Sequence, residues 1–323
     1  MILLEGNQTD GNSRELRTMK AKVSFHESIA ANADVNSDNV GNPTFVRDTD
    51  PHTLASEIKE LALASTSRSE FDDAEELWRY LLHLQSGLTP PCTDDEVVAT
   101  LAHIGRCCQS SGRYQEAMSC YRDALQLKAP CQLKNEPPET KLMVACILYD
   151  IGMIHSELLF QQNPSDVGDH QVKRKLLADK AIKSFQLSLD LRKSCFGEQH
   201  HLVASAQHNI AAILTRTGNH IAAKALYEKS LATRRAVLGP KPHPEVASSL
   251  RHLAMVHRMN GENQQAASLL SEALEILYHI PHNGMLQNVI IELSHLKREL
   301  APRSASLPEA DSGPDLVLGT TVT

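Results

Sequence analysis

A period of 43 residues is the feature that most limits how this chain can fold. Residues 196–277 contain one pattern written twice, so that Gly218 matches Gly261 and Ala223 matches Ala266, each pair 43 positions apart. The two copies align without a gap. A sustained period of this length is typical of repeat arrays, in which each repeat buries its apolar face against its neighbours.

Within one copy, the apolar residues predict two helices. Leu250, Leu253 and Ala254 follow the spacing of one helix face, and Gly261 then breaks the helix. A second run with the same spacing begins at Ala266. The two alanines lie twelve residues apart, where only small side chains let two helices approach closely. This arrangement resembles the tetratricopeptide repeat, a pair of helices with small residues at the crossing.

The same pattern recurs over residues 51–300, which we expect to form five helix pairs followed by a capping helix. The predicted fold class is all-α, a right-handed α-solenoid of tandem tetratricopeptide helix pairs. Residues 1–50 are rich in Asn, Asp, Ser and Gly and are expected to be a disordered arm, and residues 301–323 a disordered tail.

The third pair carries an insertion. Gly152 and Ala181 are 29 residues apart, whereas the other copies have twelve at the same place. The extra residues centre on 161–175, a polar stretch interrupted by Pro164. We expect this stretch to loop out from one end of the helix pair, as variable surface rather than as a contact loop.

Charge and cysteine content exclude several classes of function. Of the net charge of −7, only −2 falls on residues 51–300, which argues against nucleic acid or an anionic membrane as the main partner. The seven cysteines include no C-x-x-C motif, which is typical of reduced packing residues. Glu5 follows the opening MILL directly, and we find no secretory or membrane-inserting segment. We therefore expect a cytoplasmic protein without membrane insertion.

A second motif narrows the repeat type. Arg234 is followed by Leu238-Gly239 and then by His243-Pro244, in the pattern R-x-x-x-L-G before H-P-x-V-A. With the 42–43-residue period, this motif resembles kinesin light chain. In that family two adjacent asparagines precede the Leu-Ala pair and line a groove that takes cargo peptides. The resemblance therefore implies an adaptor that binds peptides.

The asparagine positions of the resemblance are occupied differently in this chain. They hold Lys59-Glu60, Ala102-His103, Tyr149-Asp150, His208-Asn209 and Arg251-His252. Only Asn209 matches. Light chains also carry an N-terminal heptad segment that joins the motor heavy chain, and residues 1–50 show no sustained heptad pattern. A light-chain-like adaptor is therefore a better match than a motor subunit.

The sequence contains no recognised catalytic motif. We find no phosphate-binding loop, no H-E-x-x-H and no G-x-S-x-G. His200, His201 and His208 could approach one another around a metal, but surface and groove histidines explain them better. The acidic run from Asp72 to Glu76 opens a predicted helix, where negative charge favours the helix dipole. We predict no catalytic residue, no metal and no cofactor.

Function is then expected from the inner face of the repeats, formed by the first helix of each pair. The candidate groove residues are polar positions on this face: His103, Arg106, Asp150, His208, Asn209, Arg216, Arg251, His252 and Arg258. Because Arg216, Arg251 and Arg258 gather in the C-terminal half, we expect that half to bind an acidic peptide of a partner protein.

Two other classes stay open. A structural subunit of a stable complex would show a broad exposed apolar patch, and an enzyme or ligand sensor would show a deep pocket of perturbed titratable groups.

A modification site is predicted in the tail. Residues 303–308 read R-S-x-S-x-P, which resembles the phosphoserine motif bound by 14-3-3 proteins, with Ser306 as the acceptor. A phosphate there would add charge and three acceptor oxygens for an arginine cluster.

Overall fold

The computed structural model describes residues 50–162, 168–281 and 283–300, and these residues contain helices but no strand. The helices are α2 (Pro51–Ser67), α3 (Phe71–Gly87), α4 (Asp94–Ser110), α5 (Tyr114–Leu127), the 3-10 helix η1 (Pro130–Asn135), α6 (Pro138–Phe160), α7 (Asp169–Phe196), α8 (His201–Arg216), α9 (His220–Leu238), α10 (Pro244–Met259), α11 (Asn263–Tyr278) and α12 (Met285–Leu300). The predicted all-α class of tandem helix pairs is confirmed.

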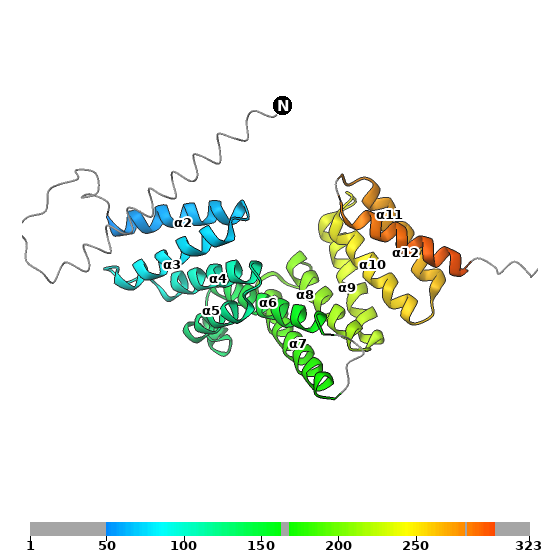
Figure 1. Ribbon diagram of the computed structural model, residues 1–323, viewed down its shortest axis with the longest axis horizontal. Helices are drawn as coiled ribbons and strands as arrows, with labels where there is room; N and C mark the ends of the chain where they lie inside the picture. The colour runs from blue at the N-terminus through cyan, green and yellow to red at the C-terminus, as the bar shows by residue number, and fades with distance from the viewer. Residues whose placement is uncertain (1–49, 163–167, 282, 301–323) are drawn as a thin grey trace, which may run out of the picture. The chain divides into compact units, whose positions relative to one another are not determined.

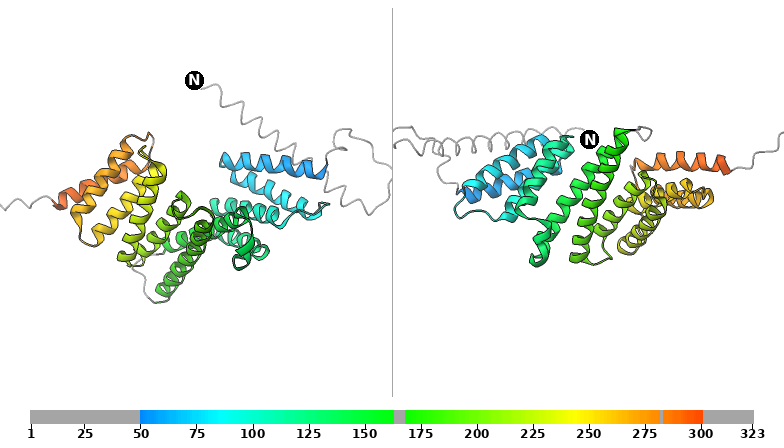
Figure 2. Two further views of the ribbon diagram at one scale, coloured as in Figure 1. Left: turned by 180° about the vertical axis from the view of Figure 1, so that it is seen from behind. Right: turned by 90° about the horizontal axis from the view of Figure 1, so that it is seen from below.

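The chain divides into two compact units, which we call the first unit (residues 1–218) and the second unit (residues 219–323). In the described part of the first unit, each α-helix from α2 to α7 packs against the next α-helix in the chain (Figure 1). Figure 2 shows the same succession from two further sides. In the second unit, α9 packs on α10, α10 on α11, and α11 on the capping helix α12.

The helices begin and end where local chemistry favours it. At the start of α4, the Thr93 side chain accepts a hydrogen bond from the Glu96 backbone N–H, and the Glu96 carboxylate accepts one from the Thr93 backbone N–H. These two hydrogen bonds form a complete capping box. His243 accepts from the Glu245 N–H and is followed by Pro244 at the first turn of α10. Gly261 has a φ of +77°, the left-handed conformation that ends α10 and allows the chain to turn back.

Small residues set the distance between the two helices of a pair. A Cβ on Gly152 would lie 2.7 Å from the Phe185 ring, and one on Gly105 would lie 2.5 Å from the Tyr121 ring. Both rings are fully buried. Tight crossings therefore lie at the small positions that define the sequence pattern, with an aromatic ring of the second helix filling the space above a glycine.

The insertion in the third pair was predicted as a loop, and that prediction is wrong for residues 169–175. Helix α7 already begins at Asp169 and runs for 28 residues, and α6 is 23 residues long. The inserted residues therefore lengthen the helix pair. Residues 173–177 read KRKLL, good helix formers, and this local preference outweighs the break signalled by Pro164, which lies outside the described residues.

The R-x-x-x-L-G motif has a structural role. Arg234 is buried in α9 and donates hydrogen bonds to the Glu245 carbonyl at 3.0 Å and to the Ser249 hydroxyl at 2.6 Å. In the first unit, Arg192 of α7 is buried likewise and donates to the Leu202 carbonyl at 2.8 Å. In both places a guanidinium of a second helix is hydrogen-bonded to a backbone carbonyl in the first turn of the next helix, which joins neighbouring repeats.

Helix α6 is long and apolar enough to cross a membrane, the one described helix of which this is true, with a mean hydropathy of 1.6. Several of its apolar residues belong to the core, because Val144, Ile147 and Ile154 are fully buried. The predicted disordered arm, the predicted tail and Ser306 lie outside the described residues.

Candidate peptide-binding surface

In the first unit, α4 and α6 bring three of the predicted groove residues together. His103 and Arg106 lie one turn apart on α4. The Arg106 Nε atom lies 3.4 Å from the Asp150 Oδ2 atom on α6. About half of the Arg106 side chain is exposed, whereas Asp150 is largely covered. His103 borders one cavity, and Arg106 and Asp150 border a second one further along α4.

The first cavity has a volume of about 430 Å³ and lies among α2, α3, α4 and α6. Its walls are mostly apolar and include Ala55, Leu81 and Met143. The His103 ring stacks on the Trp78 indole, with 4.2 Å between ring centroids and 8° between planes. Burial, with Arg106 and Lys59 nearby, lowers the pKa of His103 to about 4, so its imidazole is neutral near pH 7.

Among the residues around this cavity, three buried polar atoms lack a hydrogen-bond partner, of which the Asp95 Oδ1 atom is paired with Lys128; the other two have no ion pair. They are the indole nitrogen of Trp78 and the amide oxygen of Gln85, which follow one another two turns apart on α3. Both atoms have essentially no accessible surface, so their cost in free energy belongs to the packing of α3 and not to a ligand site. The exposed Lys59 of α2 adds a cation at the same cavity.

The second cavity, also about 430 Å³, lies between the ends of α4 and α6 and contains Arg106 and Asp150. Burial raises the pKa of Asp150 to about 6, against the opposing effect of Arg106 and Arg192. The Asp150 carboxylate therefore becomes protonated at a pH not far below neutral, and its ion pair with Arg106 is then weakened.

The remaining predicted residues of the first unit lie on α8 and are engaged within the chain. The Asn209 amide donates to the Tyr149 hydroxyl at 2.7 Å. Arg216 donates to the backbone carbonyls of Phe160 and Gln162 at 3.3 and 3.0 Å. His208 is only 8% exposed. These residues fix the end of α6 against α8 more than they present groups to a partner.

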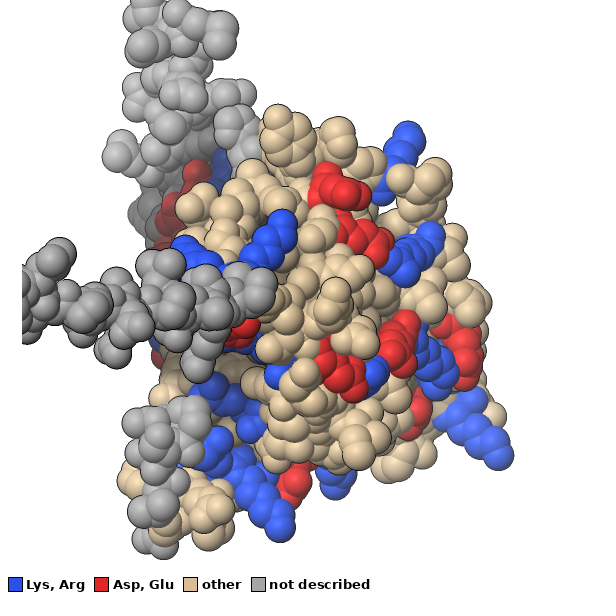
Figure 3. Space-filling view, turned by 90° about the vertical axis from the view of Figure 1, so that its right-hand side faces the viewer, with Lys and Arg blue, Asp and Glu red and all other residues tan. Residues whose placement is uncertain are grey.

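In the second unit, the predicted basic residues are paired with glutamates of the capping helix. The Arg251 Nε and Nη2 atoms lie 2.9 and 2.5 Å from Glu292, and Arg258 lies 2.9 Å from Glu299. The adjoining cavity is about 190 Å³. Figure 3 views the molecule from the side of α11 and α12, and acidic and basic side chains are interspersed across that face.

These pairs weaken the reason for placing an acidic peptide in the C-terminal half. The sequence shows Arg216, Arg251 and Arg258 but not their distant acceptors, which come from α6 and α12. His252 is also engaged, because its Nδ1 atom lies 2.8 Å from the Ser248 carbonyl, and burial lowers its pKa.

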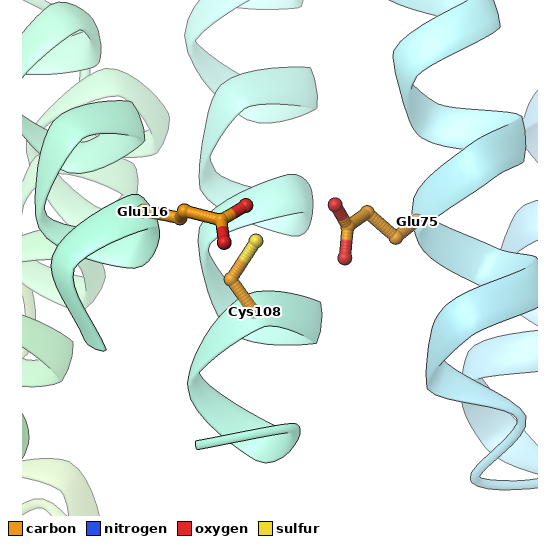
Figure 4. A group of neighbouring side chains, drawn as sticks. All are labelled: Glu75, Cys108 and Glu116. Atoms are coloured by element: carbon orange, nitrogen blue, oxygen red, sulfur yellow. The ribbon is translucent and has the colours of Figure 1, made fainter. Parts of the chain in front are cut away.

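A cluster of Glu75, Cys108 and Glu116 was not predicted, and its side chains point toward one another from α3, α4 and α5 (Figure 4). Arg113 binds both carboxylates, and so does Arg79. Burial raises the pKa of the Cys108 thiol to about 12, so the thiol stays protonated near neutral pH. An ion-pair network therefore explains the cluster.

The histidines considered for a metal also have structural roles. His200 accepts a hydrogen bond from the Leu202 N–H at the start of α8, and its ring stacks on Phe196 at 4.0 Å. His201 lies beside it, with 4.5 Å between the ring centroids, and His208 lies two turns further along α8.

Comparison with known proteins identifies the repeats. Two family models for the tetratricopeptide repeat match residues 174–236 and 202–278, and residues 100–134. Two curated relatives are from Arabidopsis thaliana. Protein KINESIN LIGHT CHAIN-RELATED 1 is 24% identical over 234 residues, which cover 72% of this chain and 34% of that protein. Protein KINESIN LIGHT CHAIN-RELATED 3 is 25% identical over 226 residues, covering 68% and 30%.

A solved structure shows a similar fold. BtubC (BKLC) from P. vanneervenii matches with a TM-score of 0.57 and 17% identity, over 96% of this chain and 99% of that one. The chain thus contains tetratricopeptide repeats and is similar to kinesin light chain-related proteins. It spans about a third of the length of the curated relatives it matches. Such repeats generally act as scaffolds for protein interactions.

Proposed function

We propose that this chain is a protein-interaction adaptor that binds an extended peptide segment on α4 and α6 of the first unit. The observation that carries the proposal is the pair of 430 Å³ cavities that flank His103 and Arg106. Mostly apolar pockets with a few polar groups are what ligand sites in proteins generally offer.

The chemistry of the two cavities defines the segment that they would bind. The apolar wall and the neutral His103–Trp78 stack of the first cavity suit an uncharged, apolar side chain. Each cavity contains one lysine or arginine among carboxylates: Lys59 with Asp95, Glu96 and Glu139 in the first, and Arg106 with Asp150 and Glu157 in the second. Arg106, about half exposed, is the cation that would receive a carboxylate from the partner. The proposed segment therefore has an apolar anchor for the first cavity and a single carboxylate opposite Arg106.

Peptide selection with the intact chain would test this proposal. A random peptide library is selected on the wild-type chain, and the recovered peptides are measured against Arg106→Glu and against a matched reversal, Arg251→Glu. We expect Arg106→Glu to weaken binding at least about tenfold and Arg251→Glu to change it little. If Arg106→Glu leaves peptide binding unchanged and Arg251→Glu abolishes it, the site lies in the second unit and the proposal is contradicted.

The tail adds a separate proposal. Phosphorylated Ser306 would bind a 14-3-3 protein through charge-assisted hydrogen bonds to arginine. Capture of 14-3-3 by the phosphorylated chain is compared with capture by Ser306→Ala. Equal capture would contradict this proposal.

A further inference from the structure

The outward face of α7 is an exposed feature that peptide binding on α4 and α6 leaves unused. The core-facing residues Ala181 and Phe185 are fully buried. On the opposite side of the helix, Val172, Leu176 and Leu187 are 69%, 51% and 38% exposed. With 3.6 residues per turn, these three lie within about 60° of one another around the helix axis. Val172 and Leu176 lie on successive turns, and Leu187 lies three turns beyond Leu176, with Asp179 and Lys183 between them on the same side. The three apolar side chains form an interrupted line that faces away from the core.

Lysines border this line along its whole length. Lys183 lies on the line itself, Lys173 and Lys180 lie on one side of it, and Lys175 lies on the other. All four are exposed. Asp179 is the one acidic residue between positions 172 and 187. We call residues 172–187 on this side of α7 the α7 outer face.

The other second helices of the first unit have the opposite charge at the same register. When the helices are aligned on their fully buried alanines, Lys180 and Lys183 correspond to Asp73 and Glu76 in α3. Lys180 corresponds to Glu116 in α5. The α7 outer face therefore differs from the solvated, acidic outer faces of its neighbours in both polarity and charge.

We propose that the α7 outer face binds a helix of a partner protein, one with an apolar stripe flanked by glutamates or aspartates. The face is narrow, one side chain wide in its apolar part, and about 22 Å long at 1.5 Å per residue. These dimensions suit four turns of a packed helix. The lysines on its borders complement acidic side chains on both sides of such a stripe.

A lipid surface is less well matched to the same residues. Val172 and Leu176 lie near the start of α7, and Leu187 is three to four turns further along. Asp179 lies within the face and Asp190 lies one turn beyond it. An anionic membrane would have to accommodate both carboxylates, whereas a partner helix can place neutral or basic residues opposite them.

The test uses the full chain and a synthetic helical peptide with a leucine stripe flanked by glutamates. Its control is the same peptide with lysine in place of every glutamate. Binding is followed by fluorescence anisotropy of a labelled peptide. We expect the glutamate peptide to bind and the lysine peptide to bind at least about tenfold more weakly. Added salt should weaken binding, because exposed charges are screened over about 8–10 Å.

Two variants assign the binding to α7. Val172→Ser with Leu176→Ser removes the apolar line, and Lys180→Glu with Lys183→Glu reverses the border charge. Each change is on exposed residues, so circular dichroism should be unchanged, and each should weaken binding at least about tenfold. Arg122→Glu, a reversal of an exposed residue on α5, is the matched control and should leave binding unchanged.

The proposal is overturned if both peptides bind equally, if neither binds, or if the α7 variants bind like wild type. Sedimentation with vesicles that contain phosphatidylserine supplies the other outcome. Binding to these vesicles without binding to the glutamate peptide would replace the partner helix with a membrane.

Discussion

In the first unit, Arg106 meets one carboxylate at 3.4 Å and borders a cavity of about 430 Å³. In the second unit, Arg251 makes closer contacts with Glu292 and borders a cavity of about 190 Å³. Both arginines lie on the first helix of a repeat. The difference comes from the helix that supplies the carboxylate. Helix α6 supplies Arg106 with a largely covered aspartate. Helix α12 supplies Arg251 and Arg258 with one half-exposed glutamate each.

The comparison teaches that net charge on a repeat face is a poor guide to where a partner binds. A cation whose charge is already matched by its neighbour has less to gain from a second carboxylate. Open space beside a cation, which the first unit has at Arg106, is a better indicator.

The largest expected change tests the helix crossing beneath the second cavity. Gly152→Leu should lower the free energy of unfolding by about 3 kcal/mol, because its side chain would collide with the buried Phe185 ring. Ala254→Trp, its counterpart in the second unit, should cost about 1–3 kcal/mol. Urea unfolding measures both, with Gly87→Ala as the control, since a Cβ at Gly87 meets nothing within 4 Å. An unchanged midpoint for Gly152→Leu would contradict the packing described.

The second prediction concerns the buried arginines that both units share. Arg234→Met should cost about 1–3 kcal/mol, because the Glu245 carbonyl and the Ser249 hydroxyl lose their donor. Arg192→Met should cost a similar amount in the first unit. The matched control is Arg235→Met, which removes an exposed pair with Glu272 and should cost under about 1 kcal/mol. Equal losses at positions 234 and 235 would show that the buried contacts do not stabilise the fold.

The third prediction concerns how the stability of the first unit depends on pH through Asp150. The folded-state pKa of Asp150 is raised from 3.8 to about 6, so the folded state binds more protons than the unfolded state between these values. Its ionisation therefore destabilises the fold as pH rises through about 6. The free energy of unfolding of Asp150→Asn, relative to that of wild type, should increase by about 1–3 kcal/mol from pH 4 to pH 7. Unfolding at several pH values gives this difference. A difference that is flat with pH would contradict the raised pKa.

The smallest expected effect is at the glutamate pairs of the second unit. Arg251→Ala should cost about 1 kcal/mol or less, since partly exposed ion pairs contribute little. The charge swap of Arg251→Glu with Glu292→Arg should recover most of the loss from Arg251→Glu alone. Thermal unfolding of wild type, the two single charge reversals and the double variant would measure how much the ion pair stabilises the fold. No recovery in the double variant would mean that the pairing does not stabilise α12.

The sequence predicted the elements of the fold well because the repeat signal is local. The spacing of Leu250, Leu253 and Ala254 and the turn at Gly261 each depend on a few neighbouring residues. Helix α7 was misjudged because a proline and polar residues indicated a loop, while the residues from Lys173 onward continue a helix. Aligning the copies showed that the third pair has extra residues, but not whether they form a loop or lengthen the helices.

The candidate surface was less predictable, because it depends on contacts between residues about 40 or more positions apart. Arg106 and Asp150 were both predicted, but their pairing depends on how α4 packs beside α6. The glutamates that engage Arg251 and Arg258 lie 41 residues further along the chain. One signal could have suggested them: Glu292 and Glu299 recur seven residues apart on α12, as Arg251 and Arg258 do on α10.

Hydrogen exchange with a selected peptide tests the central claim most directly, that the first unit and not the second binds the partner. Exchange of backbone amides is measured by mass spectrometry with and without the peptide, and the segments of α4 and α6 are compared with those of α10 and α12. We predict slower exchange around His103, Arg106 and Asp150 and no change around Arg251 and Arg258. Protection confined to α10 and α12 would contradict the account and return the binding site to the arginines of the second unit.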